Sequence, residues 1–167
     1  MNKTIKEALC ILEGLGVPLN DLTERRKEKM AKAFISVAGL KPGMGWSEIK
    51  DNDAGHRLTT RQIISHMNSC WGESISFGSY DDIRRKDMVL PVEAFIVLNS
   101  AKNPNANTND GTRGFAISPL AAKAIRQYGT ADWMAAVEFF HQGRPTLASK
   151  LNRTRNLARV PVRMSEV

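Results

Sequence analysis

Three consecutive cations, Arg84, Arg85 and Lys86, are the residues whose type and spacing point most directly to a chemistry. They follow Ser79-Tyr80-Asp81-Asp82, which resembles a helix capping box with Asp in place of Glu at the third helical position. The pattern predicts a helix that exposes Tyr80 and the cations. Arginine can donate two hydrogen bonds to the guanine edge in the major groove, and tyrosine can stack or reach a phosphate. The segment therefore has the composition of a DNA recognition helix.

An ionic surface is the alternative interpretation of the same segment. Asp81, Asp82 and Asp87 lie among the cations and could pair with them as a solvated face. Both interpretations remain open from the sequence. Either way, Ile83 and Met88 are expected on the buried side of the helix.

A second helix is predicted before the basic one, over Thr59–Trp71. Thr59 or Thr60 can accept hydrogen bonds from its exposed amides. Arg57 and Arg61 lie near its start, where phosphate contacts are expected. Gly and Ser residues between positions 72 and 78 supply the turn to the basic helix. The predicted buried side of this helix consists of Ile63, Ile64, Met67, Cys70 and Trp71.

A hairpin is predicted after the basic helix, with strands at Phe95–Leu98 and Gly114–Ile117. Its loop is rich in asparagine and ends with Asp110-Gly111, which suits a tight turn. Such a wing can grip the DNA backbone or minor groove, although asparagine-rich loops are also common as exposed connectors. The expected wing contacts are Lys102, Asn105, Asn107, Asn109 and Arg113.

The order helix, turn, basic helix and hairpin is that of a winged helix. The sequence thus predicts a mainly α fold with a small β-hairpin, in which a winged helix-turn-helix core carries flanking N- and C-terminal helices. We expect an N-terminal helical segment at 1–45, a DNA-binding core with following helices at 46–145, and a basic C-terminal helix or tail at 146–167.

The flanking helices are read from their apolar patterns and punctuation. Helices are predicted over Thr4–Leu15 and Asn20–Ala38, and the charged start of the second is interpreted as a solvated face. Trp46 anchors the loop between 39 and 56. Ser118 and Pro119 open a helix that runs through Tyr128. Thr130 caps a further helix, whose expected core residues are Trp133, Met134, Val137, Phe139 and Phe140.

Composition limits the class of protein. The 167 residues carry a formal net charge of +7, which favours a polyanionic partner. No apolar run approaches the length of a membrane span or of a signal peptide, so a cytoplasmic protein without a membrane partner is expected. Cys10 and Cys70 are interpreted as reduced, buried thiols. No Cys or His pair has a metal-ligand spacing, and no metal or other cofactor is expected.

Glu48-Ile49-Lys50 has the Glu-x-Lys spacing of a metal-dependent nuclease strand. A hydrolytic site of this type also needs an upstream Asp at a strand end. Asp21 is the nearest preceding Asp and falls in a helical pattern, and the residues before Glu48 do not make a strand. No catalytic residues are therefore expected in this chain.

Several segments resemble the N-terminal helix-turn-helix domain of the BsuBI and PstI type restriction endonucleases, over roughly Ile5 to Arg155. The resemblance implies a DNA-binding specificity module of a restriction-modification or related defence system. In that family the domain precedes a nuclease domain, which this chain is expected to lack. The segments that carry the resemblance are Ala38–Pro42, Trp46-Ser47, Ser79–Arg85, Phe95–Leu98, Asn103-Pro104, Thr108-Asn109 and Tyr128–Trp133.

The leading hypothesis is a non-enzymatic protein that binds double-stranded DNA. One alternative is an interaction subunit that docks a nuclease or methyltransferase chain or forms a homodimer; a winged-helix transcriptional regulator is another, and a self-contained nuclease a third. The recognised sequence or base modification does not follow from one sequence. Trp46, Trp71 and Phe77 are interpreted as packing residues, and they do not form an aromatic cage for a modified base.

Overall fold

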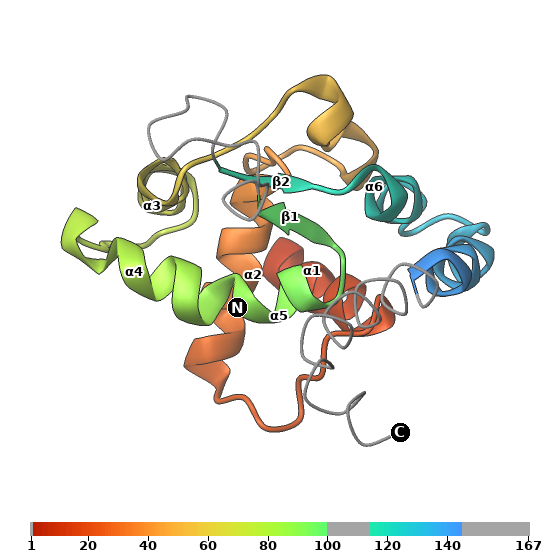
Figure 1. Ribbon diagram of the computed structural model, residues 1–167, viewed down its shortest axis with the longest axis horizontal. Helices are drawn as coiled ribbons and strands as arrows, with labels where there is room; N and C mark the ends of the chain where they lie inside the picture. Colours follow the sequence, from red (N-terminus) through yellow and green to blue (C-terminus); the bar gives the residue numbers. More distant parts are fainter. Residues whose placement is uncertain (1, 100–113, 145–167) are drawn as a thin grey trace, which may run out of the picture.

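A computed structural model describes residues 2–99 and 114–144 of the chain. It is mostly helical with one two-stranded antiparallel hairpin, as the sequence predicts (Figure 1). The α-helices are α1 (Lys3–Gly14), α2 (Glu24–Val37), α3 (Thr60–Cys70), α4 (Tyr80–Asp82), α5 (Val89–Glu93) and α6 (Pro119–Ile125), and residues 133–144 are also helical. The 3-10 helices are η1 (Trp46–Glu48), η2 (Asn52–Ala54) and η3 (Phe77–Ser79); η4 (Ile83–Asp87) is a π-helix, and the strands are β1 (Val97–Asn99) and β2 (Phe115–Ile117).

Helix α2 is the centre of the molecule and contacts α1, α3, η4 and β2 (Figure 1). All eight residues from Met30 to Val37 are buried, and a helix buried on every side is typical of a core element. The helix begins four residues later than the predicted Asn20. Thr23 sets this boundary, because its Oγ1 accepts a hydrogen bond from the amide of Arg26 at 3.2 Å. Asp21 consequently lies in a turn and outside any helix.

Helix α3 confirms the predicted first helix of the motif and decides which threonine caps it. Thr59 Oγ1 accepts from the amide of Gln62 at 3.3 Å, and the Thr59 amide donates to Gln62 Oε1 at 2.8 Å. This reciprocal pair is a complete capping box. At the other end, the Trp71 indole donates to the carbonyl of Leu40 at 3.2 Å, which fixes the helix end to the loop after α2.

The basic helix starts earlier and is less regular than the sequence predicts. The helical backbone begins at Phe77 in η3, so Ser79 lies inside the turn and its side chain makes no capping hydrogen bond. The predicted capping box is therefore wrong. A wide π turn follows, in which the Met88 amide donates to the carbonyl of Ile83 at 2.9 Å. Ile83 and Met88 then lie five residues apart on the same buried side, which confirms their predicted orientation.

The hairpin pairs Val97 with Ile117 and is extended by a bridge between Leu58 and Phe115. A Cβ on Gly114 would lie 2.8 Å from the carbonyl oxygen of Leu58, so this close approach requires glycine. The first strand starts at Val97, two residues later than predicted. Phe95 has a positive φ of 63° and turns the chain out of α5, so it cannot belong to the strand.

The start of α6 agrees with the prediction, whereas the end of α6 and the buried residues of helix 133–144 differ from it. Ser118 and Pro119 open α6 as expected, with Ser118 Oγ accepting from the Ala121 amide at 3.1 Å, but the helix ends at Ile125 and turns carry the chain past Tyr128. In helix 133–144, Phe140 is fully buried. Met134 and Phe139 are instead 76% and 57% exposed, so their assignment to the core is wrong.

The predicted aromatic anchor of the loop at 39–56 is confirmed. Trp46 is buried and stacks on Phe34 of α2 with ring centroids 6.0 Å apart. Both cysteines are free thiols, but Cys10 is exposed and Cys70 is half-buried, so the predicted burial is wrong for Cys10. Over residues 2–99 and 114–144, no helix combines the length and apolarity needed to cross a membrane.

Candidate nucleic-acid interface

The outer side of η4 carries the three predicted cations. Arg84 pairs with Asp81 at 2.7 Å, Arg85 approaches the same carboxylate at 3.7 Å, and Lys86 lies 3.7 Å from Asp82. All three cations are exposed. Exposed ion pairs contribute about 0–1 kcal/mol each, so their side chains can change partner at little cost. The cations thus form the ion pairs that the ionic-surface interpretation predicts, and they remain accessible to a partner.

The π turn explains why three consecutive cations can all face outward. In a regular α-helix, positions four apart share a face. Here the wider turn also brings Met88, five residues after Ile83, to the inner side beside Asp87 and leaves the three cations outside. π-turns occur often at functional sites.

The start of α3 meets the start of α4 on the same side of the molecule. The Arg61 guanidinium lies over the ring of Tyr80, 5.9 Å from its centroid, which is a cation–π geometry. The structure therefore brings Arg61 next to the start of the basic helix. Arg57 is directed elsewhere, since it is half-buried and its Nε donates to Asn52 Oδ1 at 3.1 Å. The predicted wing contacts, from Lys102 to Arg113, lie outside the described residues.

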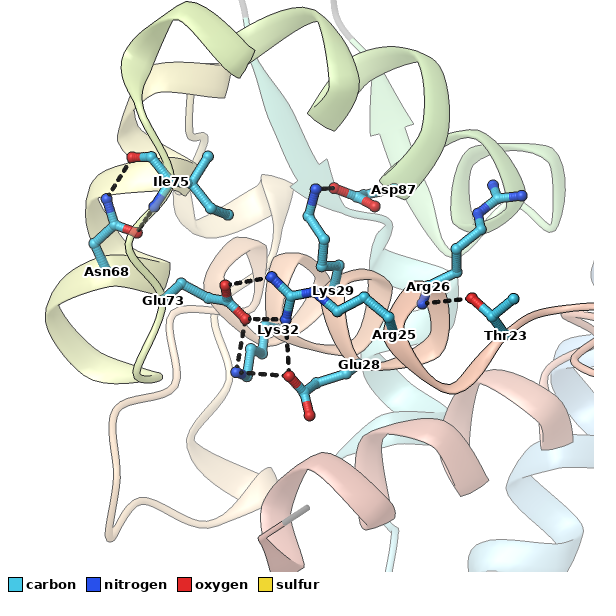
Figure 2. A network of polar contacts seen from close by, with 10 residues as sticks. All are labelled: Thr23, Arg25, Arg26, Glu28, Lys29, Lys32, Asn68, Glu73, Ile75 and Asp87. Atoms are coloured by element: carbon cyan, nitrogen blue, oxygen red, sulfur yellow. Dashed lines mark hydrogen bonds and ion pairs between the residues drawn. The ribbon is translucent and has the colours of Figure 1, made fainter.

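The turn between the two helices is fixed by one side chain. Asn68 of α3 accepts from the amide of Ile75 at 2.9 Å and donates to the carbonyl of Ile75 at 2.8 Å (Figure 2). This two-bond pairing satisfies both backbone groups of a residue in the turn. It also sets the distance between the end of α3 and the start of η3.

A buried carboxylate joins this turn to the central helix. Glu73 has a side chain that is 6% exposed, and both of its oxygens accept from Arg25, each at 2.7 Å (Figure 2). Lys32 donates to the same carboxylate at 2.8 Å and to Glu28 at 3.2 Å. The hydrogen bonds from Arg25 above all lower the pKa of Glu73 to about 2, and they raise the pKa of Arg25 in return. The cluster of Arg25, Glu28, Lys32 and Glu73 is called the α2 clamp below.

A second buried acid, Asp87, is the last residue of η4 and has fewer partners than Glu73. Asp87 is 4% exposed, and Lys29 Nζ lies 3.7 Å from its Oδ2, which is too far for a hydrogen bond. Among the described residues, that oxygen has no hydrogen-bond partner. Burial raises the pKa of Asp87 to about 6, although the nearby charges of Lys29 and Arg26 act in the opposite direction. Asp87 therefore pairs inward with α2 and not with the exposed cations, contrary to the sequence interpretation.

Comparisons with known proteins place this arrangement in a family. A family model described as the BsuBI/PstI restriction endonuclease HTH domain matches residues 2–149. The chain belongs to this family. The resemblance predicted from the sequence is thereby confirmed, and the family description agrees with the helix-turn-helix formed by α3 and the helical segment after it.

Two restriction enzymes are similar to the chain. Type II restriction enzyme BsuBI of Bacillus subtilis is 25% identical over 166 residues, which are 99% of this chain and 50% of the relative. The solved structure of SdaI restriction endonuclease is 28% identical, with a TM-score of 0.66 over 82% of this chain and 40% of that one. The chain thus spans about half the length of the curated relative that it matches.

The Glu-x-Lys triplet has a structural role in this family member. Glu48 lies in η1, and its carboxylate accepts from the amide of Gly45 at 2.6 Å, so it caps a 3-10 turn and does not lie on a strand. The described residues hold no cluster of three or more His, Cys, Asp or Glu side chains that could bind a metal ion. The triplet therefore does not have the strand geometry on which the nuclease interpretation depends.

Sequence reasoning missed the residues that hold the interface together. The charged start of α2, residues 24–29, was interpreted as a solvated face, and its first three residues are exposed. Arg25 nevertheless binds Glu73, and Lys32, further along the helix, is buried. One signal was available: Lys32 interrupts an otherwise apolar and small run from Met30 to Val37, and a lysine there needs a buried anion. That the anion would be Glu73, 41 residues away, could not be read from the spacing.

We expect Glu73→Gln to destabilise the protein by roughly 3 kcal/mol at pH 7, because it leaves Lys32 buried without its main anionic partner. The folded pKa of Glu73, about 2, lies below its ordinary 4.5. Its contribution is therefore complete above pH 4.5 and lost as the pH falls towards 2. Urea denaturation should show the difference from wild type shrinking over that range. Glu138→Gln, the same change at an exposed site, is the control, and a difference independent of pH would contradict the assignment.

We expect Asp87→Asn to stabilise the protein at pH 7 by about 1–3 kcal/mol, because it removes a buried charge that lacks a hydrogen bond at Oδ2. The folded pKa, about 6, lies above the ordinary 3.8, so the folded state binds the extra proton. Wild-type stability should accordingly fall as the pH rises from 3.8 to 6, and the variant should lack this component. Thermal unfolding at pH 4 and 7 measures both effects, with the exposed Asp53→Asn as control. Destabilisation at pH 7 would mean that the Lys29 attraction outweighs the burial cost.

Proposed function

We propose that this domain binds double-stranded DNA through the outer side of α4 and η4, as the specificity module of a restriction or related defence system. In this arrangement Tyr80, Arg84, Arg85 and Lys86 face the major groove. Arg61 at the start of α3 contacts the backbone, with Arg57 and Ser79 at the edges. The loop between β1 and β2, with Lys102, Asn105, Asn107, Asn109 and Arg113, contacts the flanking backbone or minor groove.

The observation that carries the proposal is the exposed cationic helix held against a rigid support. The three cations of η4 are exposed while Ile83, Asp87 and Met88 on the opposite side are buried against the rest of the fold. A recognition helix must keep its position while its outer side is free, because small displacements weaken bidentate contacts with bases. The α2 clamp and the Asn68 pairing supply that support.

The exposed acids do not oppose this function strongly. Asp81 and Asp82 hold the cations in extended, paired positions, and three cations against two carboxylates leave one net positive charge, to which Arg61 adds another. Phosphates or guanine edges can replace these carboxylates because exposed pairs are weak. We propose accordingly that segment 46–145 makes the DNA contacts, that 1–45 supports it, that the basic residues of 146–167 form a separate tail, and that none of these segments is catalytic or holds a cofactor.

We expect the double variant Arg84→Ala, Arg85→Ala to weaken DNA binding by about 1–3 kcal/mol per arginine if these residues read bases, with loss of sequence preference. If they contact only phosphates, the affinity should fall for all sequences and its dependence on salt should become shallower. Fluorescence anisotropy with duplexes of 20–30 base pairs at two salt concentrations separates these results.

The matched control removes the same charge from another part of the surface. Lys6 of α1 and Lys123 of α6 are exposed and lie on other elements, so Lys6→Ala, Lys123→Ala lowers the net charge by two without touching η4. If the DNA affinity falls equally in both double variants, the effect comes from the net charge of the protein and not from a specific surface on η4. Unchanged affinity in a folded Arg84, Arg85 variant would refute the proposed surface.

A protein-docking function is the second candidate, favoured by a different part of the surface. Met134 and Phe139 lie on helix 133–144 and are more than half exposed, which is unusual for residues of this size. The curated relative that the chain matches is about twice as long as this chain. A catalytic chain or segment, a methyltransferase or a second copy of the chain would be the partner.

We expect Met134→Ser, Phe139→Ser to leave DNA affinity unchanged and to alter any self-association, because helix 133–144, which carries both residues, lies far from α4 (Figure 1). Size-exclusion chromatography with light scattering measures the oligomeric state of the free protein, and the same experiment with duplex DNA shows whether the variant still binds it. If the wild type is a dimer and the double variant a monomer, Met134 and Phe139 take part in self-association. Loss of DNA binding in the variant would contradict the separation of helix 133–144 from the proposed DNA-binding surface.

A further inference from the structure

Two aromatic side chains are exposed where the basic helix begins. Phe77 is 54% exposed and Tyr80 is 43% exposed, although the sequence assigns Phe77 to packing. Phe77 lies outside the hydrophobic core cluster of the described residues. Phe77, Tyr80 and Arg84 are spaced at i, i+3 and i+7, a spacing that places side chains on one side of a helix. The proposed DNA-binding surface therefore begins with an apolar ring.

Cations lie close to Tyr80 of this pair. Arg61 lies over Tyr80, and Arg84 is held by Asp81 at 2.7 Å one turn further along. An exposed aromatic pair on the same segment as these guanidinium groups suits a partner that presents anionic groups around an apolar one. Duplex DNA has this chemistry in its major groove, where the C5 methyl group of a pyrimidine is the apolar feature and phosphates and guanine acceptors surround it.

We propose that Phe77 contacts the C5 methyl group of a pyrimidine in the major groove, and so distinguishes thymine or 5-methylcytosine from the corresponding base without the methyl. This inference rests on the proposed function and names what one residue reads. The N-terminal residues of a recognition helix are the ones that reach base edges, and Phe77 is the first residue of η3. Tyr80 and the two arginines then contact the adjacent bases and backbone.

Hydrogen bonds hold the backbone on both sides of Phe77. The Ser79 amide donates to the carbonyl of Ser76 at 3.0 Å, and Asn68 holds Ile75 through both of its backbone groups. Phe77 is thus presented by a turn that is hydrogen-bonded on both sides. A backbone that is already ordered does not have to become ordered when Phe77 meets a methyl group, which lowers the cost of binding.

The test is a double-mutant cycle in which Phe77 and the base methyl group are removed separately and together. Tight-binding duplexes are selected with the wild-type protein from two random pools, one containing thymine and cytosine and the other with 5-methylcytosine replacing cytosine. In each selected duplex, single thymines are then changed to uracil and single 5-methylcytosines to cytosine, which removes only the methyl group. We expect one such change to weaken wild-type binding roughly three- to tenfold, as burial of one methyl group implies. The same change should have no effect on Phe77→Ala, and the position that responds identifies the base.

Two variants serve as controls. Phe139→Ala removes an aromatic ring of similar exposure from another helix and should keep the full response to methyl removal. Phe77→Leu retains an apolar side chain and should keep part of it. Because Phe77 is exposed, the thermal unfolding midpoint of Phe77→Ala should match that of the wild type, so a loss of response cannot be attributed to unfolding.

Either of two results overturns the inference while leaving the proposed function intact. One is wild-type binding that depends on Arg84 and Arg85 yet responds to no methyl removal. The other is a response that Phe77→Ala retains in full. A wild-type protein that binds neither pool at low salt would refute both the inference and the proposed function.

Discussion

The ionised carboxylate of Glu73 is the interaction on which the helix-turn-helix geometry depends. It lies in the turn after α3, with its side chain almost fully buried, and it accepts hydrogen bonds from Arg25 and Lys32 of α2. A buried charge is tolerated only when it is paired, so the turn can take only positions that keep all three groups together. Since α2 also packs against α1 and β2, the clamp connects the orientation of the basic helix to the whole core.

The π turn at η4 solves a conflict between packing and surface chemistry. The core requires Ile83 and Met88 inside, while the sequence places three cations and Asp87 between them. The wider turn satisfies the packing and exposes the cations, but it also buries Asp87 beside Lys29 without a hydrogen bond to Oδ2. Local stability is thus reduced at the element that carries the proposed contacts, a trade that is common at functional sites.

Much of the fold could be predicted from the sequence because its signals are local. Thr59 and Ser118 each accept a hydrogen bond from the amide three residues along, and Pro119 fixes φ in the first turn, so the starts of α3 and α6 were readable. The errors have non-local or competing causes. Phe95 turns left-handed although its neighbours have a strand pattern, and Ser79 fails to cap because the helical turn already starts at Phe77. In the candidate site, the cations and their acids were predictable, but the pairing of Glu73 with α2 requires the tertiary fold.

Membership of the BsuBI/PstI family and the exposed basic helix lead to one central claim, that the side of the molecule formed by α4, η4 and the start of α3 binds duplex DNA. The most direct measurement is a titration of isotopically labelled protein with a duplex, followed through its backbone amide resonances. The account predicts that shifts concentrate at Arg61 and at residues 77–86, with little change in α6 or helix 133–144. Shifts centred on helix 133–144, or none at low salt, would contradict it.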